Sequence, residues 1–159
     1  MRFLAFIFAA TLACGQGYTQ LTGTALTSVC PANGYGWPAT MPESFDWADK
    51  CFTIVNDWGG ATVDTRRNRV LIWGGGHVSY RGNEVYSLEL DPAHLSTTYI
   101  ARTNSTAPTM VRLNNPSVYN TNCTANADGT PESTHSYSGI IYLPKADSTS
   151  SIPTVAVLL

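Results

Sequence analysis

Four residues of this chain have side chains that could bind a polar ligand or transfer a proton. His77, Tyr80 and Glu84 follow closely after a run of three glycines, and His135 stands near Glu132 later in the chain. Imidazole, phenol and carboxyl groups are the usual general acids and bases of proteins. We therefore treat these four residues as candidate ligand-binding residues. The alternative is that His77 and Glu84 form structural hydrogen bonds between adjacent units of the fold.

Other reactive groupings have less support. A metal site made of His77, Glu84 and His135 would have suitable ligand atoms but no diagnostic spacing, so we expect no metal and no cofactor. The chain has no G-x-S-x-G motif, and Cys123 has no histidine beside it in the sequence. Carboxylate pairs for glycoside hydrolysis are set by geometry and stay open. No catalytic residue is assigned.

The glycine run Gly74, Gly75 and Gly76 follows the apolar segment VLIW (70–73) and precedes the alternating segment NEVYSLEL (83–90). A phosphate-binding loop needs a helix that starts directly after the glycines, and the sequence shows no helix start there. We expect the three glycines to be structural. They would end a buried strand at a place where neighbouring backbones come close.

The elements expected to position these residues are short strands joined by turns. The chain has 159 residues, 13 glycines and 9 prolines, and it lacks a long apolar stripe at helical spacing. These features indicate an all-β chain with room for about one domain. Strands are predicted at 58–65, 70–73, 83–90 and 97–103, after an irregular entry segment at 16–56.

The first residues have the features of a secretory signal. Arg2 precedes an apolar run at 3–13 that is too short to span a bilayer comfortably, and Ala13-Cys14-Gly15 fits a small-residue cleavage site. We expect residues 1–15 to be a signal peptide, no transmembrane span, and a secreted or periplasmic protein. A lipid anchor at Cys14 and a buried N-terminal strand are the alternatives.

Export makes the cysteines candidates for disulfides. Cys30 and Cys51 bracket a segment rich in proline and glycine. A bridge between them would stabilise the fold by about 3 kcal/mol on the chain-entropy model. Cys123 would then be a free thiol, or its partner would lie outside this chain. Charged residues make up only 13% of the sequence and form no basic face, so no nucleic-acid partner is expected.

Two segments resemble a kelch repeat. VLIWGG (70–75) is similar to the apolar strand and glycine pair of that motif, and NEVYSLELD (83–91) is similar to its following strand. The tryptophan of the motif's outer strand is absent, and Tyr99 lies in that neighbourhood. The stretch 61–91 also resembles secreted bacterial kelch-type proteins, whose propellers belong with the galactose oxidase central domain. The resemblance implies a four-stranded propeller blade at 57–103.

A second, incomplete blade is expected at 132–159. Setting Gly139 against Gly60 places IIYL (140–143) on the first strand, but no glycine pair follows at the expected place. Residues 104–131 would form a long loop with room for one short strand. Because propellers close a ring of roughly four to eight blades, the chain looks like the N-terminal fragment of a longer protein with further blades. A small self-contained β domain is the alternative.

The resemblance implies an exported partial kelch-type β-propeller that acts as a binding or interaction module for a carbohydrate or protein ligand. Resemblance to galactose oxidase implies an incomplete copper oxidoreductase as the alternative. No residue of that copper site can be carried over to this sequence. We do not expect the fragment by itself to be an enzyme.

Overall fold

The computed structural model describes residues 21–35, 47–57, 59–74, 80–91, 93, 95, 99–103, 105–117, 125–126, 128–144 and 155–157. Most of the regular structure in these residues is antiparallel β-sheet, as the sequence predicts for an all-β chain. The three helices whose bounds are described are single turns that precede the first strand. The elements in chain order are η1 (Leu26–Val29), α1 (Trp47–Lys50), α2 (Thr53–Asn56), β1 (Gly59–Asp64), β2 (Arg69–Gly74), β3 (Tyr86–Glu89), β4 (Ala101–Arg102), β5 (Thr109–Arg112), β6 (Ile140–Tyr142) and β7 (Val155–Val157).

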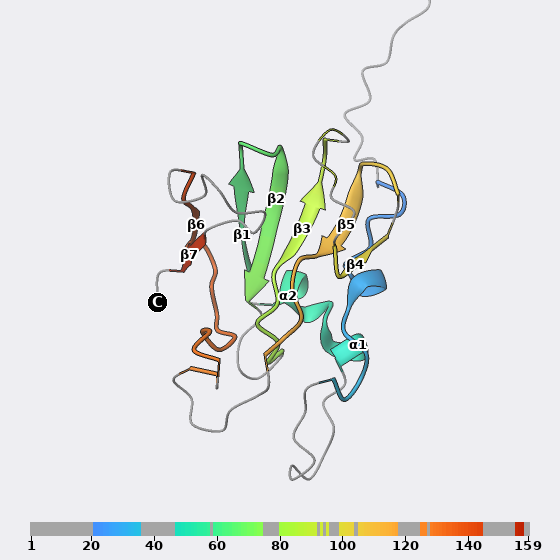
Figure 1. Cartoon of the computed structure of the whole chain (residues 1–159). Coiled ribbons are helices and arrows are strands. Elements are labelled where there is room, and N and C mark those ends of the chain that lie inside the picture. Colours follow the sequence, from blue (N-terminus) through green and yellow to red (C-terminus); the bar gives the residue numbers. More distant parts are fainter. Residues whose placement is uncertain are drawn as a thin grey trace, which may run out of the picture.

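Five strands form one antiparallel sheet in the order β1-β2-β3-β5-β4 (Figure 1). The strands β1, β2 and β3 follow one another in the chain and lie side by side. The register places Asp64 opposite Arg69, and Arg69 opposite Glu89. Side chains alternate between the two faces of a strand, so these three charged residues share one face of the sheet.

The strand beside β3 is β5, whereas the sequence pattern placed a fourth strand at 97–103. In the described part of that range, 99–103, the strand covers Ala101–Arg102, and β4 pairs with β5 at the edge of the sheet. All four residues of β5 are buried. A strand buried on both faces lacks the alternation of apolar and polar residues that marks a half-exposed strand. This explains why β5 gave a weak signal within 104–131, where one short strand was allowed for.

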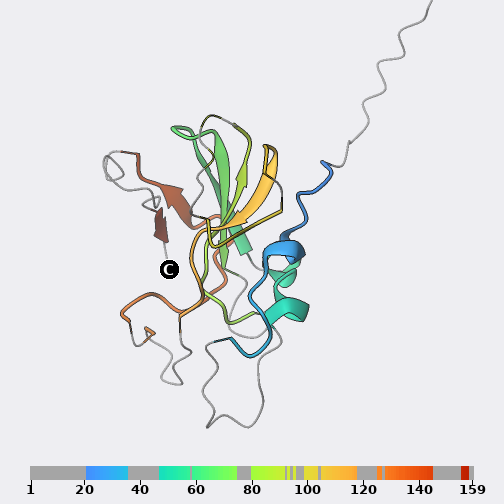
Figure 2. The same ribbon diagram turned by 45° about the vertical axis from the view of Figure 1, so that its right-hand side comes forward.

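The first face of the five-stranded sheet is covered by η1, α1 and α2, which we call the entry layer. Figure 2 shows the sheet between the entry layer on one side and the β6–β7 hairpin on the other. The apolar core lies between the entry layer and the sheet. It contains Leu26, Val29, Trp47, Cys51, Ile54, Tyr80, Tyr86 and Met110.

The β6–β7 hairpin forms a second sheet that lies against β1. Gly60 allows this approach, because a Cβ atom at that position would lie 2.2 Å from the carbonyl oxygen of Tyr137. Strand β6 falls within the predicted segment 140–143, and its partner β7 begins at Val155. The segment before β6 is anchored to the first sheet, because the Ser136 hydroxyl donates a hydrogen bond to the Trp73 carbonyl oxygen at 2.9 Å.

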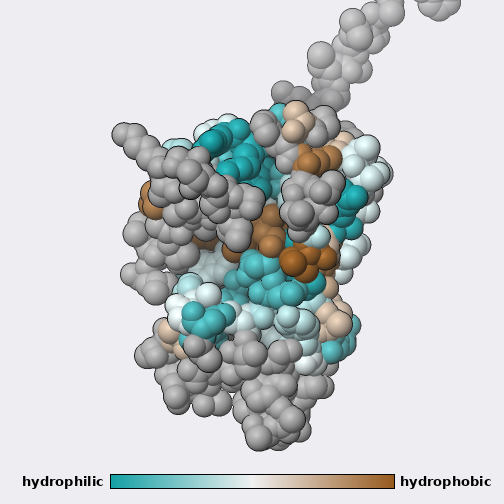
Figure 3. Space-filling view, in the orientation of Figure 1, coloured by the Kyte–Doolittle hydropathy of each residue, from teal (hydrophilic) through white to brown (hydrophobic). Residues whose placement is uncertain are grey.

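No helix among the described residues is long and apolar enough to cross a membrane. The surface in Figure 3 shows apolar regions on one side of the molecule as small brown patches, separated by polar surface.

Candidate functional site

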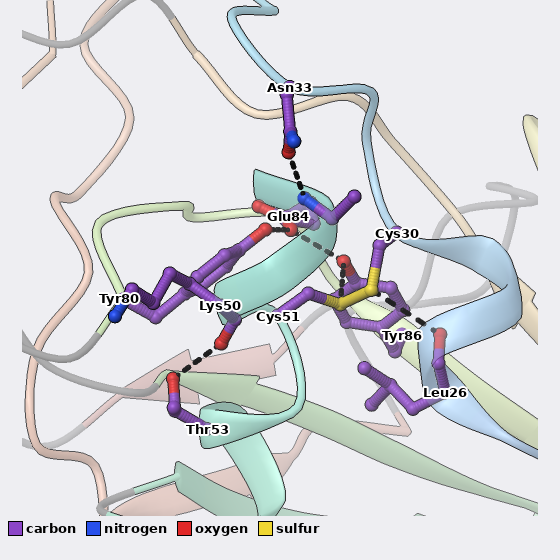
Figure 4. Close-up of a disulfide and its surroundings, with 10 residues drawn as sticks. Leu26, Cys30, Asn33, Lys50, Cys51, Thr53, Tyr80, Glu84 and Tyr86 are labelled. Atoms are coloured by element: carbon purple, nitrogen blue, oxygen red, sulfur yellow. Dashed lines mark hydrogen bonds between the residues drawn. A yellow bond between two sulfur atoms is a disulfide. The ribbon is translucent and has the colours of Figure 1, made fainter. Parts of the chain in front are cut away.

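The most unusual polar group of the structure is the carboxyl of Glu84, which lies just before β3. Glu84, Tyr80 and Tyr86 each have 0% of their surface exposed. The Tyr86 hydroxyl donates a hydrogen bond to Glu84 Oε1 at 2.5 Å, and the Tyr80 hydroxyl donates to the same oxygen. Figure 4 shows the three side chains converging beneath the short helices. We call these three residues the Glu84 cluster.

Local sequence explains how the cluster forms. Glu84 and Tyr86 are two residues apart in extended chain, so their side chains point to the same face. A Cβ atom at Gly82 would lie 2.2 Å from Glu84 Oε2 and 2.4 Å from Cε1 of Tyr80. Glycine at position 82 therefore lets the loop fold tightly over the carboxyl and bring Tyr80 to it.

The cluster also contacts the entry layer. Cys30 and Cys51 form the predicted disulfide, with 5.9 Å between their Cα atoms. The Cys51 sulfur lies 3.2 Å from the Tyr86 hydroxyl oxygen (Figure 4). The Trp47 ring packs edge-on against Tyr80, with ring centroids 5.5 Å apart. The cluster therefore connects β3, the loop before it and the disulfide-linked entry layer.

Burial dominates the electrostatics of the cluster. It raises the pKa of Glu84, although hydrogen bonds from the two tyrosines and the charge of Arg112 act in the opposite direction. Burial, together with the negative charge of Glu84, also raises the pKa values of Tyr80 and Tyr86. Both phenols therefore stay protonated and act as hydrogen-bond donors. Arg112 stands opposite Tyr86 in the register of β3 and β5.

The structure brings together two of the four candidate ligand-binding residues, Tyr80 and Glu84. Both are sealed inside the core, so neither offers a surface to a ligand. His135 belongs to the segment that packs on the opposite face of the sheet. Its ring lies edge-on to the Tyr137 ring, with ring centroids 5.9 Å apart. His77 lies outside the described residues, as do Gly75, Gly76 and Cys123.

Gly74, the first residue of the glycine run, ends β2 with a positive φ of 104°. A Cβ atom there would lie 2.3 Å from the Ser136 hydroxyl oxygen and 3.0 Å from the Thr134 carbonyl oxygen. Both the backbone conformation and the close approach of the segment before β6 require a residue without a side chain. These contacts give Gly74 a structural role.

Sequence reasoning missed a second buried polar group, which we call the Arg69 ladder. Arg69 Nε donates to Asp64 Oδ2 at 2.8 Å, and Arg69 Nη1 donates to Glu89 Oε1 at 3.2 Å. Burial would raise the pKa of Asp64, but hydrogen bonds from Arg69 and Arg67 outweigh it and lower that pKa. The available signal was the turn 65–68, which places Asp64 and Arg69 opposite each other across a hairpin.

A third polar group, around Asn83, was also missed. The Asn83 side-chain amide donates to Thr130 Oγ1 at 2.8 Å and to the Pro131 carbonyl oxygen at 3.1 Å. Its side-chain oxygen accepts a hydrogen bond from the Ser117 backbone at 2.8 Å, and its main-chain oxygen accepts one from the Trp73 indole at 2.9 Å. Asn83 thus fixes two loops, 114–117 and 128–131, to the first sheet.

In the described part of the chain, no three His, Cys, Asp or Glu side chains come together as a set able to hold a metal ion. Comparison of the chain with protein-family models, curated proteins and solved structures finds no match.

Proposed function

We propose that the chain is an exported kelch-type propeller segment that acts as a binding or interaction module. The observation that carries the proposal is the packing of one antiparallel β unit on another. The strands β1, β2, β3 and β5, with the short β4 at the edge, form one sheet, and the β6–β7 hairpin lies against β1 at Gly60. Face-to-face packing of consecutive antiparallel sheets is the principle on which propellers are built.

The distribution of polar residues favours a module with a rigid frame over an open reactive site. The acids Glu84, Asp64 and Glu89 are completely buried and bonded to neighbouring tyrosine or arginine side chains. These bonds tie the acids to the sheet and to the loop before β3. Reactive side chains that are sealed in this way do not reach a substrate in solution.

The loops fixed by Asn83 are the best-supported binding surface. Asp128 is exposed, and hydrogen bonds from Ser117 and Thr130 lower its pKa to about 2, so the carboxylate is ionised at neutral pH. Ser117 Oγ donates to Asp128 Oδ2 at 2.6 Å. Ligand-binding residues are commonly carried by loops on a rigid scaffold. Carboxylate and hydroxyl groups held in this way suit the hydroxyls of a carbohydrate or the polar groups of a protein.

The disulfide supports the exported part of the proposal. Cys30–Cys51 closes a loop within the entry layer, and such bonds persist mainly in oxidising compartments. A secreted or periplasmic location fits this chemistry.

Affinity electrophoresis of the full chain through gels containing xylan, laminarin or galactomannan tests the proposal, with immobilised proteins of the culture medium as a second panel. Copper-loaded protein is assayed in parallel for hydrogen peroxide formed from galactose. We expect saturable retention on one ligand that Asp128→Ala weakens, and no peroxide above a heat-denatured control. Copper-dependent peroxide formation by the folded chain would instead support the oxidoreductase.

A further inference from the structure

The carboxyl of Glu84 has two oxygens in very different surroundings. Oε1 accepts hydrogen bonds from Tyr80 and Tyr86, whereas Oε2 faces Gly82 and has no hydrogen-bond partner among the described residues. An ionised carboxylate carries negative charge on both oxygens, and burying one of them without a donor is costly. The neutral acid avoids much of that cost, because its charge is removed. The geometry of the cluster thus suits the protonated carboxyl.

The groups that face Glu84 come from four parts of the fold. The loop supplies Tyr80, β3 supplies Tyr86, and β5 supplies a cation, Arg112. The entry layer supplies the disulfide and the Trp47 ring, which reach the cluster through its tyrosines and carry no charge. Within the described structure, Arg112 Nε and Nη1 make no hydrogen bond, and none is made to Glu84 Oε2. The charge of Arg112 therefore lowers the pKa of Glu84 without a hydrogen bond to Oε2.

The two tyrosines that Glu84 holds are the residues on which the entry layer rests. Trp47 packs against Tyr80, and Cys51 lies against the Tyr86 hydroxyl. Displacement of the two phenols would remove the contacts of Trp47, at the start of α1, and of Cys51, directly after its end. Ionisation of Glu84 strengthens the phenol hydrogen bonds to Oε1 but leaves a charged Oε2 buried without a donor, and water that enters to solvate Oε2 opens the packing around the phenols.

We propose that Glu84 is a proton-operated latch: the neutral acid holds Tyr80 and Tyr86 in place beneath the entry layer, and ionisation of Glu84 releases that layer from the sheet. The latch is closed at low pH and loosens as the pH rises. It requires no ligand and no covalent step.

Proton linkage gives the direction in which pH changes the stability of the cluster. The pKa of Glu84 is raised in the folded protein, so the folded chain retains this proton at pH values where the unfolded chain has lost it. The stabilisation is fully present below the unfolded pKa, about 4.3, and is lost as the pH rises through the folded value. Local opening that exposes Glu84 has the same dependence, because the opened state resembles the unfolded chain at this residue.

The test measures how fast a phosphine reductant breaks the Cys30–Cys51 bond in the full chain between pH 5 and pH 8. Differential alkylation and peptide mapping follow this bond specifically. We expect the reduction rate of the natural chain to rise about tenfold over this interval, as the open population grows. Glu84→Gln keeps an oxygen that accepts from both tyrosines but cannot ionise. We expect its rate to stay low and almost independent of pH.

Two further measurements keep the test decisive if Glu84→Gln folds poorly. Tyr86→Phe removes the hydroxyl between Glu84 and Cys51, so the disulfide should be reduced faster at every pH. Amide hydrogen exchange in the natural chain, corrected for its intrinsic pH dependence, should show loss of protection in α1 and α2 as the pH rises while β2 stays protected. A reduction rate that does not change with pH, or one that rises equally in Glu84→Gln, would overturn the proposal. Equal loss of protection in β2 would also overturn it.

Discussion

The Ser136 hydroxyl donates a hydrogen bond to the main-chain oxygen of Trp73 at 2.9 Å, although 63 residues separate the two in the chain. This bond joins the end of β2 to the segment that leads into β6. It forms where Gly74 turns out of its strand with a positive φ, so that the two backbones come close. The glycine after a buried strand is thus explained by the arrival of the next β unit.

Replacing Gly74 by alanine should cost the fold about 3 kcal/mol. Roughly 1 kcal/mol comes from the positive φ, and the rest comes from the collision of the new Cβ atom with Ser136. Gly129→Ala is the matched control, because Gly129 has a φ of 80° but nothing within 4 Å of the added atom. We expect this control to cost only about 1 kcal/mol. Urea unfolding of both variants checks the difference, and equal costs would show that the close approach at Gly74 is unimportant.

The disulfide should stabilise the chain by about 3 kcal/mol through its effect on the unfolded state. Non-reducing peptide mapping of the exported protein should recover Cys30 and Cys51 as one linked pair, and the double alanine variant should unfold at correspondingly lower urea. Recovery of Cys123 linked to either residue would contradict the pairing. An unchanged unfolding midpoint in the double variant would show that the bridge contributes little.

Breaking the Arg69 ladder should strongly lower the free energy of unfolding. Arg69→Met removes the cation that Asp64 and Glu89 share, and leaves both acids buried without it, at a cost of about 3–5 kcal/mol. Arg67→Met is the control, because its side chain is 15% exposed and forms an ion pair with Asp64 at 3.0 Å. Its loss should cost about 1 kcal/mol. Chemical unfolding at neutral pH compares the two, and similar costs would contradict a central role for Arg69.

The same ladder predicts sensitivity to acid, opposite in sign to the Glu84 latch. The pKa of Asp64 is lowered in the fold, so its contribution is present above the unfolded pKa of about 3.9 and is lost as the pH falls through the folded value. Urea unfolding between pH 5 and pH 2.5 should show this loss in the natural chain. Arg69→Met should show less of it, since the interaction that lowers the pKa is gone. An equal loss of stability at low pH in both proteins would show that groups other than the Arg69 ladder cause the acid sensitivity.

Asn83→Ala should loosen the two loops it holds without unfolding the sheet. The variant removes the side-chain bonds to Thr130, Pro131 and Ser117, whereas Asn115→Ala changes an exposed residue of the same loop as a control. Amide exchange should increase at 114–117 and 128–131 in the first variant and stay unchanged in the second. Unaltered exchange in Asn83→Ala would show that other contacts fix these loops.

Local patterns predicted much of the first sheet. The apolar run at 70–73, the alternation at 83–90 and the turn at 65–68 lie where β2, β3 and the β1–β2 hairpin are found. The segment 140–143 likewise contains β6. These signals are local because side-chain alternation and turn residues act over a few positions.

The remaining features depend on contacts between distant parts of the chain. β5 is buried on both faces, so its short sequence carries no alternation to distinguish it from a loop. Glu84 and Tyr80 are candidate ligand-binding residues in the sequence because they lie on or next to the loop expected after the glycine run, but in the structure both are completely buried. The pairing of Glu84 with two tyrosines depends on Gly82 and on a loop fold that spacing alone does not specify.

Nuclear Overhauser contacts in the full chain report directly on the packing of the β6–β7 hairpin against β1, on which the proposed propeller segment depends. The Cδ1 methyl of Ile140 lies 3.0 Å from the place of a Cβ atom on Gly60, so a cross-peak between that methyl and the Gly60 α-protons is expected. Gly60→Ala should weaken this cross-peak while β1–β2 contacts persist. Absence of the Ile140–Gly60 cross-peak, in a chain whose β6–β7 contacts are intact, would show that the hairpin does not pack on the first sheet and would contradict the account.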